Sequence, residues 1–198
     1  TVNDWVQVPH NESYYGDNAV EDNGGSWAFI SDTGNAWYAN ALKSMSASEI
    51  NAYLAQFDVW DRNDFDHDGN YDEPDGYIDH FQAVHAGQGE EAGGGAQGED
   101  AIWSHRWYVN QGDYGLTGPS VAGQENKAGG TRIGDSNYWL GDYTTEPENG
   151  GLGVFCHEFG HDLGLPDYYD TAGGENGTAF WTLMSSGSWL SHGAEANE

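Results

Sequence analysis

Apolar and polar positions follow a helical period in only a few parts of the chain. The clearest is residues 47–60, where apolar side chains recur three and four positions apart: Ile50, Tyr53, Leu54 and Phe57. Ser46 precedes this stretch and Glu49 follows three residues later, which is the spacing of a capping box at a helix start. We therefore predict a helix over residues 47–60 and a shorter one over residues 36–43.

Strand-like patterns dominate the middle of the chain, where aromatic and β-branched residues stand between turn-forming ones. We predict strands at residues 76–85, 100–109, 131–133 and 137–143. Glycine-rich or turn-rich stretches separate them, notably residues 87–98 and 110–130, whereas the polar residues 1–33 predict loops and short strands. A last helix is predicted over residues 152–163, and this order of elements indicates an α+β fold.

The composition is that of a globular protein rich in aromatic residues. The 198 residues are 37% hydrophobic and include 9 Trp, 12 Tyr and 7 Phe, which suits one domain with one substantial core. No run of about 18 apolar residues occurs, so we expect no membrane span. Residues 1–5 have neither a basic start nor an apolar stretch, so we expect no signal peptide and take the chain as mature or as cut from something longer.

Net charge excludes several classes of partner. The chain has 33 acidic residues against 5 basic ones, which gives a formal charge of −28. Such a chain repels nucleic acid and anionic membrane surfaces, so neither is expected as a partner. It also repels itself unless salt screens the charge, which favours a salt-adapted (halophilic) source. An acidic extracellular protein from an ordinary habitat is the alternative.

A single cysteine, Cys156, cannot form an internal disulfide, so the fold depends on its core and on any bound metals. Its place before His157 suggests a redox or ligand role. We instead expect a small apolar residue on the buried side of the helix at residues 152–163.

The stretch CHEFGHDLGLPDYYD contains the main candidate chemistry. His157 and His161 are four residues apart, so both imidazoles leave the same face of a helix and can bind one metal ion. Glu158 beside them can hold a metal-activated water and take its proton, the role of a general base. An ordinary exposed helix face would also fit these three residues alone.

A catalytic zinc site needs a third protein ligand and leaves one position for water. Gly164 can end the helix with positive φ, and Pro166 prevents its continuation, so the chain turns back towards the metal. Asp167 would arrive there with a carboxylate oxygen. These three positions make a zinc site far more specific than His157 and His161 alone.

A second metal is predicted in the acidic loop DFDHDGNYDEPD. Its acids, a turn-forming Gly69 and one asparagine have the spacing of a calcium loop. The candidate ligands are Asp64, Asp66, Asp68, Asn70, Asp72 and Asp75. Because the last ligand is Asp and both Pro74 and Gly76 oppose an exiting helix, we expect a calcium site without a paired EF-hand. A solvated acidic surface is the alternative.

Several motifs in order resemble one protein family. HEFGHDLGLPDYYD, followed by FWTLMSSGSW and preceded by EPDGYIDHFQAVHAG and DAIWSHRW, resembles the immune inhibitor A family of secreted bacterial metallopeptidases. The string HExxHxxGxxD also resembles the metzincin signature, with Asp167 where most metzincins have a third histidine. These matches span about the last two-thirds of the chain and are far more specific than HExxH alone.

The resemblance implies a zincin or metzincin-like α+β fold, with a twisted mixed sheet, an active-site helix and a small C-terminal part. Met184 matches the methionine of the Met-turn beneath the zinc ligands. Some metzincins place a tyrosine two residues after it, where this chain has Ser186, so Tyr168, Tyr169 and His192 are candidates for the oxyanion partner. The family also implies structural calcium and secretion, and its further segments imply that residues 1–198 are one catalytic domain without its flanking parts.

We therefore expect a secreted, extracellular zinc endopeptidase that acts on proteins or peptides as a monomer. In this mechanism zinc polarises the scissile carbonyl, and Glu158 takes a proton from the attacking water and passes it to the departing amine. Two alternatives stay open: a zinc hydrolase of a non-protein amide, and a non-catalytic binding or adhesion module that holds zinc and calcium. An intact Glu158 argues against the module, because a structural site needs no base.

Two tripeptides, at Asn11 and at Asn176, match acceptors for N-glycosylation. Such tripeptides are common and indicate little without a suitable host. The second lies at the end of residues 171–178, which have the composition of a polar linker.

Overall fold

The computed structural model describes residues 5–17, 25–109, 118–121, 124–125 and 129–193. The chain forms two compact units, each built from separate stretches of sequence. The first unit contains Thr1–Asn11, Asp22–Phe81 and Tyr108–Tyr143, and the second contains Glu12–Glu21, Gln82–Trp107 and Thr144–Glu198. Among the described residues, no helix has the length and apolar character needed to cross a membrane.

The first unit combines two α-helices with short strand pairs. Its helices are α2 (Ser26–Ala41), α3 (Ala47–Leu54) and the 3₁₀ turn η1 (Ala55–Phe57). Its strands are β3 (Ser120–Val121), β4 (Gln124–Glu125), β5 (Thr131–Arg132) and β6 (Trp139–Leu140), paired antiparallel as β3–β4 and β5–β6. Fully buried Ile30, Ile50 and Leu140 form part of its core.

Helix α3 begins where the sequence predicts. The backbone N–H of Glu49 donates to the Ser46 hydroxyl at 3.3 Å, and the Glu49 carboxylate accepts from the Ser46 N–H at 2.8 Å, so the capping box is confirmed. The α-helix ends at Leu54, and η1 continues the same face for one 3₁₀ turn. The predicted helix over residues 47–60 is therefore three residues too long.

The prediction of loops and short strands over residues 1–33 is wrong for α2. This helix has 16 residues, of which the predicted helix over residues 36–43 covers only the C-terminal part. Its buried face includes Phe29, Ile30, Gly34 and Tyr38. A Cβ built on Gly34 would lie 3.2 Å from the Leu140 side chain, so the glycine permits a close approach to β6. Because glycine interrupts the apolar face, the helical period is hard to see in the sequence.

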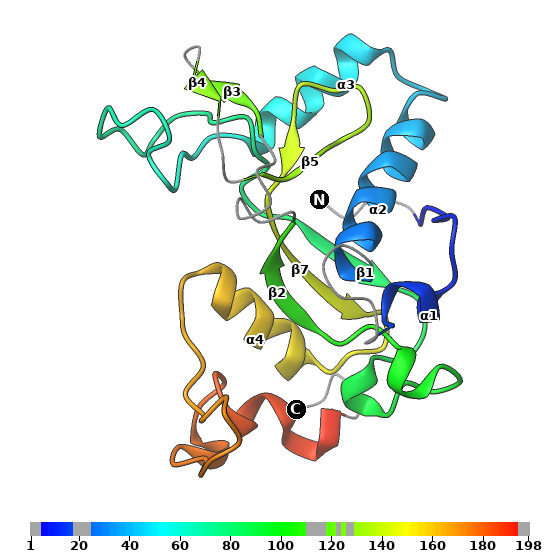
Figure 1. The fold of residues 1–198 in the computed structure, drawn as a ribbon, viewed down its shortest axis with the longest axis vertical. Coiled ribbons are helices and arrows are strands. Elements are labelled where there is room, and N and C mark those ends of the chain that lie inside the picture. Colours follow the sequence, from blue (N-terminus) through cyan, green and yellow to red (C-terminus); the bar gives the residue numbers. More distant parts are fainter. Residues whose placement is uncertain (1–4, 18–24, 110–117, 122–123, 126–128, 194–198) are drawn as a thin grey trace. The chain divides into compact units, whose positions relative to one another are not determined.

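The second unit is organised on a three-stranded sheet. Its strands are β1 (Gln82–His85), β2 (His105–Tyr108) and β7 (Asp142–Pro147), in the order β1-β7-β2. Strands β1 and β7 are parallel, and Figure 1 shows β2 running the opposite way, so the sheet is mixed. The helical elements are α1 (Glu12–Tyr15), η2 (Glu90–Ala92), η3 (Gly98–Asp100), α4 (Leu152–Asp162), η5 (Ala179–Trp181) and η6 (Ser186–Gly193). The α+β fold with a twisted mixed sheet is confirmed.

Strands β1, β2, β5 and β6 are shorter than the strands that the sequence predicts, whereas β7 extends beyond its predicted range. The predicted strand at residues 76–85 pairs as a strand only in β1, and that at residues 100–109 only in β2. The prediction of one strand at residues 137–143 is wrong, because β6 ends at Leu140 and β7 continues to Pro147. Since Tyr143–Pro147 are buried without alternation and include polar Thr144, Thr145 and Glu146, the segment lacks a strand pattern.

Helix α4 agrees with the predicted helix at residues 152–163 to within one residue. Its buried residues are Val154, His157, Glu158 and Gly160. Cys156 is exposed, so the expectation that it lies on the buried side is wrong. The turn of 100° per residue puts it on one face with Leu152, Phe159 and Leu163, which are also exposed. The apolar stripe at this position therefore faces away from the core.

Candidate metal centre

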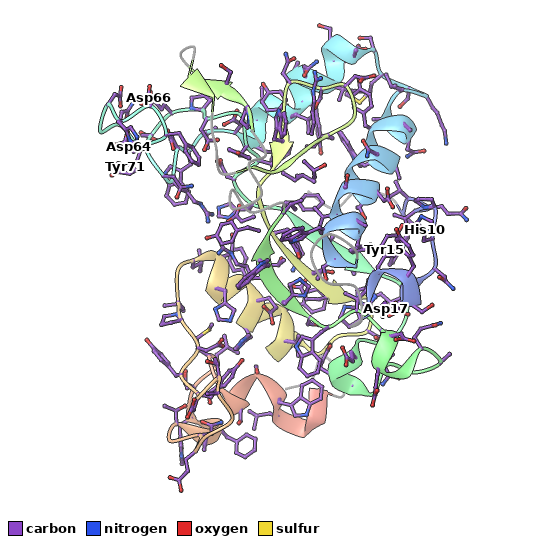
Figure 2. The ribbon with its side chains drawn as sticks, viewed as in Figure 1. His10, Tyr15, Asp17, Asp64, Asp66 and Tyr71 are labelled. Atoms are coloured by element: carbon purple, nitrogen blue, oxygen red, sulfur yellow. The ribbon has the colours of Figure 1, made fainter. Side chains whose placement is uncertain are left out.

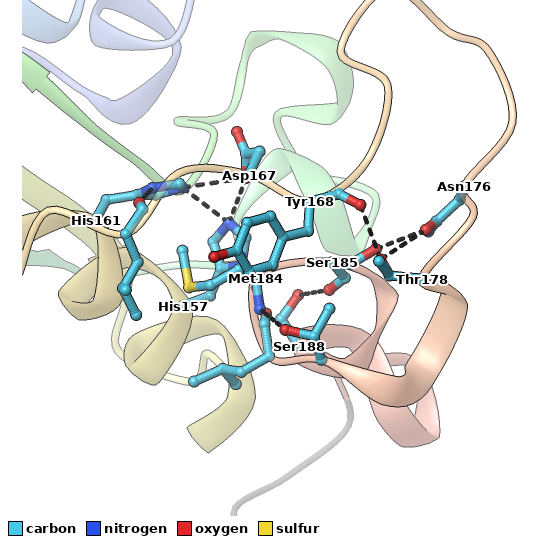
Figure 3. A network of polar contacts seen from close by, with 12 residues as sticks. His157, His161, Asp167, Tyr168, Asn176, Thr178, Met184, Ser185 and Ser188 are labelled. Carbon is cyan, nitrogen blue, oxygen red and sulfur yellow. Dashed lines mark hydrogen bonds and ion pairs between the residues drawn. The ribbon is translucent and has the colours of Figure 1, made fainter.

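Two histidines on α4 and one aspartate beyond it converge on a single point (Figure 3). The Nε2 atoms of His157 and His161 lie 3.1 Å apart. Each lies 3.2 Å from Oδ1 of Asp167. The chain reaches Asp167 because Gly164 adopts a φ of 86° and the Leu165 N–H donates to the Gly160 carbonyl, which closes the end of the helix.

The hydrogen bonds of the two imidazoles define their tautomers. His157 Nδ1 lies 2.8 Å from the Leu183 carbonyl oxygen, and His161 Nδ1 lies 2.8 Å from the Leu165 carbonyl oxygen. A carbonyl oxygen only accepts, so each Nδ1 carries the hydrogen of the neutral ring. In neutral rings, both Nε2 atoms then present lone pairs to each other and to Asp167. Three acceptors that face one another in this way repel unless a cation lies between them.

The geometry of the three donor atoms fits zinc. In a tetrahedral site with bonds of about 2.0–2.1 Å, ligand atoms lie roughly 3.3–3.4 Å apart. The separations of 3.1 and 3.2 Å found here are close to that spacing. Within the described part of the chain, Asp167 Oδ1 is also a buried atom that accepts no hydrogen bond. Two imidazole nitrogens and one carboxylate oxygen form a typical donor set for catalytic zinc.

Glu158 lies next to these ligands and is 6% exposed. One of its carboxylate oxygens lies within 4.8 Å of ligand atoms of His157 and His161. The carboxylate accepts a hydrogen bond from the backbone N–H of Arg106 on β2. Burial, followed by the negative charges of Glu146, Asp167 and Glu91, raises the pKa of Glu158 to about 8. The group is thus held between the metal ligands and the sheet.

The three candidate residues for the oxyanion partner differ in their surroundings or in whether the structure describes them. Partial burial, followed by the nearby charge of Asp167, raises the pKa of Tyr169. Tyr168 is 50% exposed and is held through its backbone, whose N–H donates to the Met184 carbonyl at 2.7 Å. The side chain of His192 lies outside the described part of the chain.

Met184 is 2% exposed and lies against α4. A Cβ built on Gly160 would lie 2.6 Å from the Met184 sulfur, so only glycine leaves room for this contact. The preceding residue, Leu183, accepts the hydrogen bond from His157. The methionine segment therefore supports α4 at the turn that carries the two histidines.

The predicted calcium loop lies in the first unit, where Asp64, Asp66 and Tyr71 project from one loop (Figure 2). Carboxylate oxygens of Asp64, Asp66 and Asp68 lie within 4.8 Å of one another. Gly69 has a φ of 84°, and its N–H donates to Asp64 at 3.0 Å, which makes the sharp turn expected of glycine there. The first three predicted ligands are thus brought together.

The carboxylates of two other predicted calcium ligands, Asp72 and Asp75, are not part of that group. Asn70 donates to Glu73, and Asp72 donates its N–H to Asn70. Asp75 is 3% exposed and accepts from the Tyr77 N–H, and burial raises its pKa to about 7.

Sequence reasoning missed two acids near this loop. Asp61 and Glu73 form a second group with Asp66, again with carboxylate oxygens within 4.8 Å of one another. Asp61 comes three residues before the first acid of the motif and is 1% exposed. Glu73 lies inside the acidic run, at a position where the calcium-loop pattern expects no ligand. In the sequence, the high density of acidic residues around this loop is the feature that could have pointed to both acids.

Comparison with known proteins gives consistent matches over the whole chain. Residues 1–198 match the family described as "Immune inhibitor A peptidase M6, catalytic domain". Immune inhibitor A from Bacillus thuringiensis subsp. alesti is 41% identical over 201 residues, a match that covers 96% of this chain and 26% of that protein. Pre-pro-metalloprotease PrtV from Vibrio cholerae serotype O1 (strain M66-2) is 40% identical over 190 residues, covering 93% of this chain and 19% of that protein. The chain thus spans about a quarter or less of these relatives.

Proposed function

The chain belongs to the Immune inhibitor A peptidase M6 family of metallopeptidases, and we propose that it is the catalytic domain of a zinc-dependent endopeptidase that hydrolyses peptide bonds in proteins. The observation that carries the proposal is the convergence of His157, His161 and Asp167. Their three candidate donor atoms lie 3.1–3.2 Å from one another, close to the spacing of ligand atoms in a tetrahedral zinc site.

Zinc bound by these ligands would supply Lewis acidity, which polarises a carbonyl group and acidifies a water molecule. Glu158 is the proposed general base: it takes a proton from the attacking water and gives it to the departing amine as the C–N bond breaks. The Arg106 N–H holds its carboxylate in place. The positive charge of a bound metal favours the ionised carboxylate and so opposes the effect of burial on its pKa.

We also propose that Met184 forms a Met-turn and that the fold is metzincin-like. Support comes from its burial against Gly160 and from the order of the motifs. The single catalytic domain over residues 1–198 stays a prediction, and so do secretion, extracellular location, monomeric state and adaptation to salt. The acidic surface, with a formal charge of −28, supports protein substrates over nucleic acid.

For the acidic loop we propose one structural calcium ion, bound through Asp64, Asp66 and Asp68. Their oxygens are hard ligands of the kind calcium prefers. Asn70, Asp72 and Asp75 remain predicted ligands, although Asp75 lies among other hydrogen bonds. Exposed acidic groups also gather without an ion, so calcium analysis must decide between a site and a solvated surface.

The variant Glu158→Gln tests the proposed mechanism. Glutamine is nearly the same size but cannot take a proton, so casein hydrolysis should fall by about 10²–10⁴-fold. Zinc content should stay near that of the unmodified chain, because Glu158 is not a proposed ligand. Substantial residual turnover at full zinc occupancy would remove Glu158 from the mechanism. Zinc without turnover in the unmodified chain would favour a binding module, and cleavage of small amides alone would favour a non-protein substrate.

A further inference from the structure

Two of the three proposed zinc ligands depend on one short segment, residues 183–185. The Leu183 carbonyl accepts from His157 Nδ1 at 2.8 Å, which orients that ring. The Met184 carbonyl accepts from the N–H of Tyr168 at 2.7 Å, one residue after Asp167. Two successive carbonyl groups therefore support ligands that come from the helix and from the loop beyond it. Any shift of this segment changes the separation of His157 and Asp167.

The segment is held in turn by the side chain of Asn176 (Figure 3). The Asn176 Oδ1 atom accepts from the Ser185 hydroxyl at 2.7 Å and from the Ala179 N–H at 2.8 Å. Its Nδ2 atom donates to the Ser186 hydroxyl. Because the Ala179 N–H is a donor, the assignment of oxygen and nitrogen in the amide is fixed by the network. One side chain thus joins residues 185 and 186 to the start of η5.

A second connection runs through Thr178 to the ligand loop. The Thr178 hydroxyl lies 2.8 Å from the Tyr168 carbonyl oxygen and 3.3 Å from Asn176 Oδ1. A hydroxyl has one hydrogen, so the shorter contact is the main hydrogen bond. Tyr168 is therefore anchored on both sides of its backbone, by Met184 and by Thr178. The first anchor directly precedes Ser185, which donates to Asn176, and the second lies beside the Asn176 amide oxygen.

These contacts favour a structural role for the tripeptide at Asn176 over that of a glycan acceptor. The Nδ2 atom, where a glycan would attach, is directed at Ser186 within the fold. Asn176 is only partly exposed, although the residues around it, 171–175, are exposed. What resembles a polar linker in the sequence is an organised hydrogen-bonded turn.

We propose that Asn176 is a positioning residue for the metal centre: it fixes residues 183–185, whose carbonyl groups hold His157 and the loop of Asp167 at the spacing that zinc requires. The inference rests on the proposed function, since it concerns the same site. Groups that orient metal ligands typically contribute 10–100-fold to metal affinity. Asn176 acts through the backbone of its neighbours, so its effect passes to the metal through geometry alone.

The test is the zinc dissociation constant of the whole chain, measured by competition with a zinc-selective chelator. Asn176→Ala removes both ends of the amide and should weaken zinc binding by about 10–100-fold. Asn176→Asp keeps the acceptor for Ser185 and Ala179 and should restore most of the affinity. Asn40→Ala is the matched control, because Asn40 lies on the exposed surface of α2, where its side chain accepts a hydrogen bond from Lys43, far along the chain from the candidate metal ligands.

Thermal unfolding of the metal-free chains separates positioning from general stability. If Asn176 served stability alone, Asn176→Ala would unfold at a lower temperature but bind zinc with unchanged affinity well below that temperature, and the proposal would be wrong. If Asn176→Ala does not fold, Ser185→Ala removes only the 2.7 Å contact and should still weaken zinc binding measurably. Failure of the unmodified chain to bind zinc would refute the proposed function itself, whereas equal affinity of all variants would refute only the role of Asn176.

Discussion

Ionisation of Glu146 should make the free energy of unfolding depend on pH. Glu146→Gln should remove this contribution of Glu146. Glu146 lies on the central strand β7 and is fully buried. Burial raises its pKa from 4.5 to about 8, and the charge of Glu91 adds to the effect, while the nearby polar side chains of Gln82 and Thr144 oppose it. Glu158 faces it from α4. At neutral pH, Glu146 is therefore protonated in the folded chain and ionised in the unfolded chain.

Proton linkage gives the sign and the size of this effect of pH on the free energy of unfolding. The folded state binds the extra proton between pH 4.5 and about 8, so this contribution to stability is complete below pH 4.5 and is lost as pH rises through about 8. Between pH 5 and pH 7 the loss from Glu146 alone is about 2–3 kcal/mol, at roughly 1.4 kcal/mol per pKa unit. Glutamine has the same shape and no charge, so the variant lacks this loss.

Urea denaturation at pH 5, 6 and 7, with a zinc-selective chelator present, measures the effect. The free energy of unfolding of Glu146→Gln should gain about 2–3 kcal/mol relative to the unmodified chain as pH rises from 5 to 7. Glu175→Gln, at an exposed position, is the control and should track the unmodified chain. A difference between Glu146→Gln and the unmodified chain that stays constant with pH would show that Glu146 does not take up a proton on folding.

Three further predictions concern other parts of the fold. Gly153→Ala should lower the free energy of unfolding by about 1–3 kcal/mol in urea titrations, because the added Cβ would lie 2.5 Å from the Ser188 carbonyl oxygen. Alanine usually stabilises helices relative to glycine, so an unchanged unfolding midpoint would contradict this contact. Ser46→Ala should cost about 1 kcal/mol by the same method through loss of the capping box with Glu49, and a cost below about 0.3 kcal/mol would show that the cap contributes little. Asp66→Asn should abolish the rise in melting temperature that calcium gives the unmodified chain, and an equal rise in both would exclude Asp66 as a ligand.

The parts of the fold that the sequence predicts well are those with local signals. Helix α3 has an apolar period and a capping box within a few residues, and α4 has two histidines that need helical spacing. Asp167 follows a glycine and a proline that leave the chain few directions. In each case, residues close in sequence determine the structure, so pattern and geometry agree.

The parts that the sequence hides depend on contacts between distant residues. Gly34 lies on the buried face of α2 only because the Leu140 side chain packs there. The polar residues Thr144 to Glu146 form a buried central strand because β1 and β2 pair on either side of it. Cys156 is exposed although it is apolar, since Val154, His157, Glu158 and Gly160 form the buried face of α4 and Met184 packs against Gly160 there. None of these partners is adjacent in the sequence.

Metal analysis combined with casein hydrolysis tests whether His157, His161 and Asp167 bind a catalytic zinc ion. We expect about one zinc per chain, with cleavage that stops when a zinc-selective chelator is added and returns when zinc is restored. A folded, metal-replete chain that holds no zinc, or cleavage that continues after the zinc has been removed, would contradict it.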